Sequence, residues 1–408
     1  MLRYHEIRIL LFLEPSSTQH LPRHSHLFMS RKRRTKAGKK PRPIIHILPN
    51  EVLMEVMKVS PAKEHAMLLL SCKLFYQLGR TLLYRSIWLT TFTAISKLHR
   101  TLFSPGGNEL ATQVRRFEVL IRHGLDWQTH PMPNVLINML GAMRHVHELQ
   151  LHIEHEFFSH LLMGDPFELL SFPNLSRLAV TLIPTFDHTS LLRFLQRHPS
   201  LTQLSISVPS RNFFLYRPFL SGFTETIKLP QLRSYSGPLE ILNLIFPTVI
   251  ALQSIVIDFG LSTDEDVEAD LKRLQRLDVR SLSVELIVNP RSPIVNLALQ
   301  HVPKNVTSLS FQYISASLNH LVMLGVPPLP DPNVVPLDVS ALRRLTHLKS
   351  FFINDVSFRS VKGAHRNLSP ELQKLIEACP SLETIKLHGR LYRRNAHAQS
   401  GYELVERR

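Results

Sequence analysis

Histidines and glutamates, two residue types that bind zinc in proteins, gather between residues 145 and 160. His152 and His155 lie three residues apart, and a helix uses that spacing to direct two ligands toward one metal ion. Residues 149–153, however, alternate apolar and polar side chains as a strand does, which would send the rings to different faces. The sequence therefore favours exposed histidines over a zinc site. The whole group comprises His145, His147, His152, His155, His160, Glu148, Glu154 and Glu156.

Motifs of common catalytic sites are missing from the sequence. It contains no Gly-rich phosphate loop, no Gly-x-Ser-x-Gly turn and no His-Glu-x-x-His pair, and its acids and bases are dispersed. The two cysteines, Cys72 and Cys379, lie far apart and suit a reducing cytosol or nucleus. We therefore expect a protein that is not an enzyme and that needs neither a metal nor another cofactor.

One apolar pattern recurs from residue 84 almost to the end of the chain. It reads apolar-x-x-apolar-x-apolar and is followed by a helical stretch, and several copies have a proline two residues ahead of the first apolar position. This pattern resembles an irregular leucine-rich-repeat array, which implies an α/β solenoid with a strand inside and a helix outside in each unit. The first apolar positions are Tyr84, Val114, Val146, Leu175, Leu201, Leu232, Leu252, Val279, Val306, Leu348 and Leu382.

The residues between the repeated apolar positions are expected to line the concave face of this solenoid. The centre of this surface is small, uncharged and rich in hydroxyl groups, which argues against a nucleic-acid site. We expect it to bind a protein target, with Trp88 and Phe352 as anchors, unless serine is merely tolerated on exposed strands. The expected target-binding residues are Trp88, Arg177, Gln203, Ser205, Ser254, Asp258, Ser283, Gln312, Phe352 and Lys386.

A short helical stretch over residues 48–75 carries more apolar surface than it can bury by itself. Pro49 suits a first helical position, and Val52, Val56 and Val59 follow at i, i+4 and i+7. A second stretch, residues 66–70, is nearly unbroken apolar sequence. Because three short helices have too little interior for all these side chains, the stretch implies a partner.

The order of residues in this stretch resembles an F-box. The similar segments are Leu48-Pro49, Glu51-Val52-Leu53, Glu55-Val56, Leu68-Leu69-Leu70, Ser71-Cys72-Lys73 and Phe75, and residues 82–87 resemble the tail of fungal members. The resemblance implies docking to a Skp-type adaptor on a cullin scaffold, and thus a substrate-recognition subunit of an SCF-type ubiquitin ligase. The adaptor-binding residues that it implies are Leu48, Pro49, Val52, Leu53, Val56, Leu69, Leu70 and Phe75.

The first 43 residues hold 11 Lys/Arg against Glu6 and Glu14 and end in the run RKRRTKAGKKPRP. We expect this segment to be disordered, and to be a nuclear import signal, a polyanion contact or simply a solvated tail. No apolar run is long enough to cross a membrane, so the expected location is the nucleus, the cytoplasm or both.

The sequence thus predicts four parts: a basic tail over 1–43, an F-box-like helical module over 44–83, the solenoid over 84–390 and a C-terminal tail over 391–408. A proline-rich segment, 326–336, is expected to be an exposed linker or a partner-binding loop. Two other functions stay open: a non-catalytic leucine-rich-repeat scaffold with a helical cap, and a nuclear nucleic-acid-associated protein that acts through its basic tail.

Overall fold

A computed structural model describes residues 48–60, 62–121, 132–153, 170–181, 189–207, 225–245, 251–258, 282–288, 294–313, 338–355, 369–387, 390–395 and 402–407, and parts of 268–275. The basic tail, the proline-rich segment 326–336, and the histidines and glutamates between 154 and 160 lie outside these ranges.

Three helices open the described chain: α1 (Asn50–Val59), α2 (Ala62–Ser71) and α3 (Lys73–Arg85). Leu53 and Met57 of α1 and Leu69 of α2 are buried, and α3 packs against both helices. The close approach depends on Gly79, since a Cβ there would overlap Met57 Cε and lie 2.8 Å from Leu69 Cδ2. The module therefore has a small core of its own, separate from the main core that begins at Ile87.

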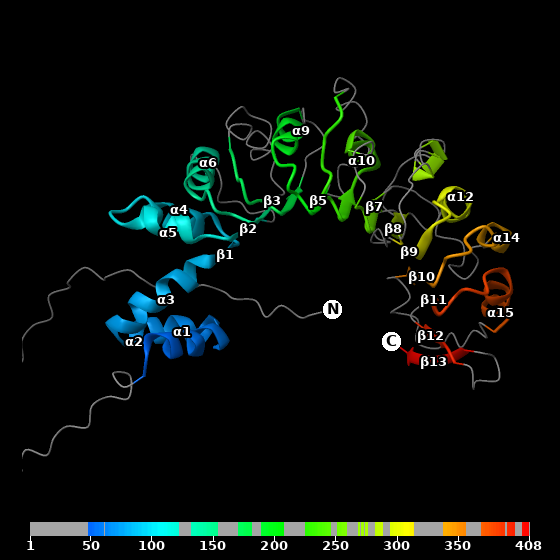
Figure 1. Cartoon of the computed structure of the whole chain (residues 1–408), viewed down its shortest axis with the longest axis horizontal. Coiled ribbons are helices and arrows are strands. Elements are labelled where there is room, and N and C mark those ends of the chain that lie inside the picture. Colours follow the sequence, from blue (N-terminus) through cyan, green and yellow to red (C-terminus); the bar gives the residue numbers. More distant parts are fainter. Residues whose placement is uncertain are drawn as a thin grey trace, which may run out of the picture.

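The described strands form one 13-stranded open sheet whose strand order follows the chain order (Figure 1). Neighbouring strands from β1 to β11 are parallel. These strands are β1 (Ser86–Leu89), β2 (Arg116–Ile121), β3 (Glu148–Ile153), β4 (Arg177–Thr181), β5 (Gln203–Ser207), β6 (Ser234–Gly237), β7 (Ser254–Asp258), β8 (Leu282–Val288), β9 (Val306–Tyr313), β10 (Ser350–Asp355) and β11 (Thr384–Leu387).

Helices connect the parallel strands and lie on the outer side of an arc, with the sheet on the inner side (Figure 1). They are α4 (Phe92–Leu102), α5 (Gly107–Gln113), α6 (Met132–Ala142), α9 (Thr189–Gln196), α10 (Leu239–Ile245), α12 (Ile294–His301), α14 (Val339–Leu342) and α15 (Ser369–Ala378). The arrangement is the one that the repeated apolar pattern predicts, with strands inside and helices outside.

The strand register places the repeated apolar residues in continuous buried rows. The row at the centre of the core contains Ile87, Phe117, Leu149, Leu178, Leu204, Tyr235, Ile255, Val284, Leu309, Phe351 and Ile385. One strand differs from the repeated pattern, in which Leu282, three residues after Val279, would fall in this row. An irregularity after Leu282 sets it opposite Val306, so that Val284 and Leu286 take the two inner buried positions.

Two further strands of the sheet fall within or overlap the C-terminal segment 391–408, which the sequence predicts to be a tail. Strands β12 (Arg390–Arg394) and β13 (Tyr402–Arg407) pair antiparallel with β11 and with each other. Tyr402 is buried and its hydroxyl donates a hydrogen bond to the Leu382 carbonyl. The hairpin covers the last parallel strand and leaves a short, charged strand at the edge, which is a common way to protect a sheet.

Candidate protein-interaction surfaces

Apolar side chains are exposed on α1 and α2 even though the module has its own core. Val59 is 81% exposed, Met67 66% and Leu70 68%. Outside the module, the large hydrophobic side chains that are exposed in the described ranges are Phe103 and Val405. We call this concentration the apolar face; it consists of Leu48, Val52, Val56, Val59, Met67, Leu70 and Tyr76.

Helical spacing explains how α1 contributes both to the apolar face and to the core of the module. Val52, Val56 and Val59 recur every three or four residues and so share one side of α1, whereas Leu53 and Met57 share another. The charged residues Glu51, Glu55, Lys58 and Glu64 are exposed on the same two helices. An apolar centre with a charged border is typical of a protein-interaction surface.

The predicted adaptor-binding residues divide between the apolar face and the interior. Leu48, Pro49, Val52, Val56 and Leu70 are exposed, and Phe75 is half-buried. Leu53 and Leu69 are 3% and 8% exposed and belong to the module's core. Sequence reasoning did not select Val59, Met67 or Tyr76, although the valine stripe and the apolar run over 66–70 already contained the first two.

Two rows of side chains on the inner side of the sheet alternate with the buried rows. All of them are at least partly exposed. Row one contains Ser86, Arg116, Glu148, Arg177, Gln203, Ser234, Ser254, Ser283, Ser308, Ser350 and Thr384. Row two contains Trp88, Glu118, Gln150, Ala179, Ser205, Ser236, Val256, Glu285, Ser310, Phe352 and Lys386.

Most of the predicted target-binding residues belong to these two rows. Gln312 is also partly exposed, further along β9, and pairs with Asn354 of β10. Asp258 ends β7, but its side chain lies outside the described part of the structure. The central strands carry serine at most of these positions, as the sequence analysis expects.

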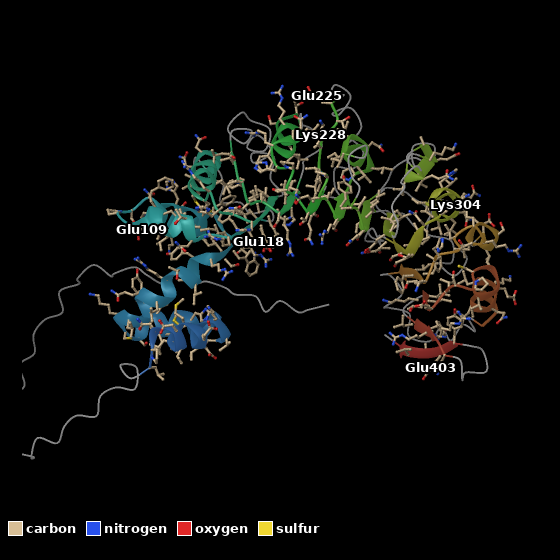
Figure 2. All side chains as sticks on the ribbon, viewed as in Figure 1. Glu109, Glu118, Glu225, Lys228, Lys304 and Glu403 are labelled. Carbon is tan, nitrogen blue, oxygen red and sulfur yellow. The ribbon has the colours of Figure 1, made fainter. Side chains whose placement is uncertain are left out.

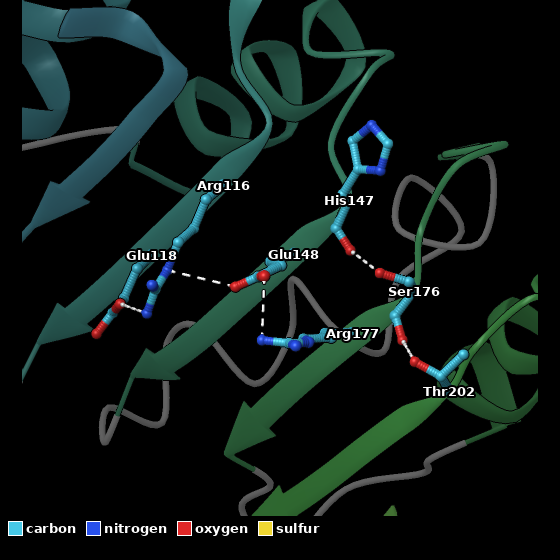
Figure 3. A network of polar contacts seen from close by, with 7 residues as sticks. All are labelled: Arg116, Glu118, His147, Glu148, Ser176, Arg177 and Thr202. Carbon is cyan, nitrogen blue, oxygen red and sulfur yellow. Dashed lines mark hydrogen bonds and ion pairs between the residues drawn. The ribbon is translucent and has the colours of Figure 1, made fainter. Parts of the chain in front are cut away.

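Charged residues of the two rows are concentrated on β2, β3 and β4 (Figure 3). Arg116 Nη2 lies 3.3 Å from Glu118 Oε2, and Arg116 Nε lies 3.5 Å from Glu148 Oε2. Arg177 Nη1 lies 3.1 Å from Glu148 Oε1. Because these side chains are partly exposed, each pair contributes less than about 1 kcal/mol. The four charges cancel, so this part of the inner side is polar without being basic.

Trp88 lies at the β1 end of row two, beside Glu118. Its ring is half-buried, and its indole Nε1 is covered without an acceptor among the described residues. An indole N–H in that position donates a hydrogen bond to any acceptor atom of a ligand that reaches it. Phe352, which the sequence also selects as an anchor, is partly exposed near the other end of the row.

The described histidines of the 145–160 group have different surroundings. His145 and His147 are exposed, and His152 Nδ1 lies 3.1 Å from Thr181 Oγ1, which is 2.8 Å from Ser207 Oγ. Among the residues that the structure describes, no cluster of three or more His, Cys, Asp or Glu side chains is suited to a metal ion. No helix in these ranges has the length and apolar character needed to span a bilayer.

One buried histidine, His198, joins two neighbouring repeats. Its Nδ1–H donates to the Phe194 carbonyl over 2.7 Å, and its Nε2 accepts the Phe172 N–H over 3.0 Å. The ring also stacks on Phe194 with centroids 4.0 Å apart. Burial lowers the pKa of His198, which keeps the neutral tautomer that both hydrogen bonds require. Its partners are structural, and the sequence gives no signal for this role.

Comparison with known proteins gives little additional information. No protein-family model matches the chain, and no curated protein matches it. One similar solved structure is the leucine-rich repeat-containing protein LegL7 from Legionella pneumophila, which is 13% identical, with 70% of this chain and 94% of that chain covered and a TM-score of 0.34. A TM-score of this size does not establish a common overall geometry, so the repeat architecture rests on the strand order and register.

Proposed function

We propose that this protein is the substrate-recognition subunit of an SCF-type cullin ubiquitin ligase. In this proposal, α1 to α3 dock a Skp-type adaptor through the apolar face, and the inner side of the sheet holds a protein target. The observation that carries it is the exposure of Val56, Val59, Met67 and Leu70 on a module whose core is already formed by other residues. The F-box-like residue order supplies the class of partner.

The energetics of exposure favour a partner for the apolar face. Complete burial of one Val, Leu or Met side chain stabilises a protein by roughly 1.5–3 kcal/mol relative to full exposure. The side chains of this face are already partly covered, so burying all of them gains several kcal/mol. Exposed apolar side chains concentrated in one place usually mark an interface. The protein itself would form no bonds with ubiquitin; its contribution would be proximity and orientation.

A binding assay with exposed substitutions tests the proposal. We expect the full chain to retain a Skp-type adaptor in a pull-down, and Val52→Glu combined with Val56→Glu to reduce binding at least about tenfold, since each carboxylate would enter an apolar interface. Phe103→Glu, an exposed apolar position outside the module, is the matched control and should bind normally. The substitution Leu53→Asp is not informative, because it places a charge in the module's core.

Each outcome of this assay has a clear meaning. If the wild-type chain does not retain the adaptor, the helical module is a cap and the protein is a leucine-rich-repeat scaffold. If the double substitution binds as well as the wild type, the apolar face is not the docking surface. Circular dichroism of each variant checks that the helices remain folded.

A further inference from the structure

The N-terminal ends of the parallel strands lie along one side of the sheet, where the helix-to-strand segments enter it. Consecutive segments are joined there by backbone hydrogen bonds, among them His147 N to Arg115 O at 2.7 Å and Arg233 N to Thr202 O at 2.8 Å. The same ladder continues with Lys349 N to Thr307 O at 2.8 Å. We call the segments 143–147, 197–202, 225–233, 302–305 and 343–349, with Arg394, the entry edge.

The entry edge is strongly basic. Its exposed Lys and Arg residues are Arg144, Arg197, Lys228, Arg233, Lys304, Arg343, Lys349 and Arg394. Glu225 is the acidic residue within these segments, and its Oε2 accepts a hydrogen bond from Gln196. A second exposed acid, Glu383, belongs to the neighbouring segment 379–383, which precedes β11. Within the described residues, the side chains of Arg144, Arg197, Lys228, Arg233, Lys304 and Arg343 make no ion pair or hydrogen bond.

Helix dipoles account for only part of this charge. Arg144, Arg197 and Lys304 follow the ends of α6, α9 and α12, where cations are favourable. Lys228 lies near the end of α10, since the N–H of the adjacent Ile227 donates to the Leu244 carbonyl. Arg233 and Lys349 instead directly precede β6 and β10, where the dipole argument does not apply. Apart from Lys349, which pairs with Glu383, these cations have no acidic partner among the described residues and repel one another, so their concentration favours an anionic ligand. Figure 2 marks Lys228 and Lys304 at two positions along the arc.

A cavity of about 440 Å³ opens on the same edge beside β9, β10 and β11. Its charged residues are Lys349, Arg394 and Glu383, with His347 beside them. Lys349 Nζ lies 3.0 Å from Glu383 Oε1, and Arg394 Nη1 donates to the Pro380 carbonyl over 3.1 Å. Hydroxyl and amide groups complete the wall, contributed by Asn305, Thr307, Thr346 and Ser381. The cavity therefore offers donors for a carboxylate that enters from the edge.

We propose that the entry edge binds an acidic segment of a target protein, with an acidic side chain in the cavity between Lys349 and Arg394. The segment would run across the beginnings of the strands. From β3 to β11 there are eight strand spacings of about 4.8 Å, so an extended acidic segment of roughly 12 residues spans the edge. This inference names the target class of the proposed receptor, and it rests on that function for its biological meaning.

An acidic polypeptide fits the edge better than nucleic acid does. Single-stranded nucleic acid uses exposed aromatic rings for base stacking, and the exposed large hydrophobic side chains of the described chain lie elsewhere. The volume of the cavity also suits one or a few amino-acid side chains. Duplex DNA needs only phosphate contacts, so the experiment must separate it from a peptide.

The test uses the full-length chain and a fluorescein-labelled dodecamer of glutamate in an anisotropy titration at low salt. We expect the triple substitution K228E, R233E and K304E to raise the Kd at least about tenfold, because contacts with carboxylates become repulsions. The matched control is K97E, R100E and K374E, which makes the same change of charge at exposed positions on the outer helices α4 and α15 and should raise the Kd less than about threefold.

Three results would overturn the inference. The two triple variants could weaken the peptide equally, a dodecamer of glutamine could bind as tightly as the glutamate peptide, or a 12-base-pair DNA duplex could bind more tightly and depend on the same three residues. The adaptor pull-down separates this inference from the proposed function. The triple substitution on the entry edge should leave adaptor binding unchanged. The acidic-segment inference and the proposed adaptor docking can therefore fail independently of each other.

Discussion

Gly79 offers a sharp test of the packing that presents the apolar face. In Gly79→Ala, the new Cβ would overlap Met57 Cε and lie 3.0 Å from Met57 Sδ and 2.8 Å from Leu69 Cδ2. Overpacking of a tight core costs about 1–3 kcal/mol. Alanine is intrinsically better than glycine in a helix by about 1 kcal/mol, which offsets part of that cost. We therefore expect a net destabilisation of the module of about 0–2 kcal/mol.

In a protein that also carries Met57→Ala, Gly79→Ala is expected to stabilise the module instead of destabilising it. Alone, Met57→Ala should destabilise the module by about 2–5 kcal/mol, because Met57 is fully buried. In its background the atoms that the new Cβ overlaps are gone, and only the end of the Leu69 side chain must adjust. Gly79→Ala should then stabilise the module by up to about 1 kcal/mol through helix propensity. The two substitutions are thus coupled, with a double-mutant cycle as the measure.

Amide hydrogen exchange of α1 to α3 is the appropriate assay, since the solenoid prevents a two-state treatment of the whole chain. Exchange rates in α3 report the opening free energy of the module in each of the four proteins. If Gly79→Ala slows exchange equally in both backgrounds, α3 does not approach α1 as closely as the structure describes. The apolar face would then lack the rigid support that our proposal requires.

Three further substitutions test other parts of the structure. Burial lowers the pKa of His198 below the unfolded value of 6.5, so its contribution to stability is complete above that pH and is lost as the pH falls through the folded-state pKa. Amide exchange in α9, corrected for the intrinsic rate, should therefore become faster below about pH 6.5, and His198→Phe should reduce this change. Tyr402→Phe should destabilise the C-terminal hairpin by about 0.5–1.5 kcal/mol, measured as faster amide exchange in β12 and β13. Glu148→Gln should change the opening free energy of β3, measured by amide exchange, by less than about 1 kcal/mol, and less still at high salt, because its ion pairs are partly exposed.

Apolar periodicity predicted the solenoid because each repeat must bury the same positions against its neighbours. The pattern places Leu149, Leu204 and Phe351 in one buried row, as the register has them. It failed at β8, since the register shifts between Leu282 and Ser283, where β9 has one extra residue, Thr307, and the apolar character of the segment gives no sign of this shift. Local sequence cannot indicate such an irregularity, because it depends on which strand lies next to it.

The sequence did not predict the C-terminal hairpin for a similar reason. Strand β12 is rich in arginine and β13 in charged residues, and the burial of Tyr402 comes from contacts with distant residues. Tyr402 is buried through its hydrogen bond to Leu382 and its packing on the main core. Neither strand carries the repeated pattern, so the predicted solenoid ended at residue 390.

On α1, amphipathic spacing predicted a helix but not which side would face inward. Val52 and Leu53 are adjacent and equally apolar, yet the first is 43% exposed and the second 3%. The position of Gly79 on α3 decides between them, because it lets α3 approach the side of α1 that carries Met57. Such a choice depends on the contact between helices and is not encoded within one of them.

The sequence does not reveal the entry edge, because the basic residues of this edge lie far apart along the chain. Arg144, Arg233, Lys304 and Lys349 are separated by dozens of residues. Parallel strands bring them to one edge, since every connection returns the chain to the same side of the sheet. Topology therefore creates a charged surface from residues that composition alone leaves scattered.

The connection between the helical module and the sheet determines how the two proposed surfaces are oriented. Helix α3 ends at Arg85 and β1 begins at Ser86, so no linker separates them. Helix α3 also contacts α5, where Arg80 Nη2 lies 3.4 Å from Glu109 Oε2, and the Arg85 carbonyl accepts the Arg115 N–H at 2.9 Å. A target held on the entry edge would therefore keep a fixed direction relative to a partner on the apolar face. Such rigidity suits a receptor whose task is to orient one protein toward another.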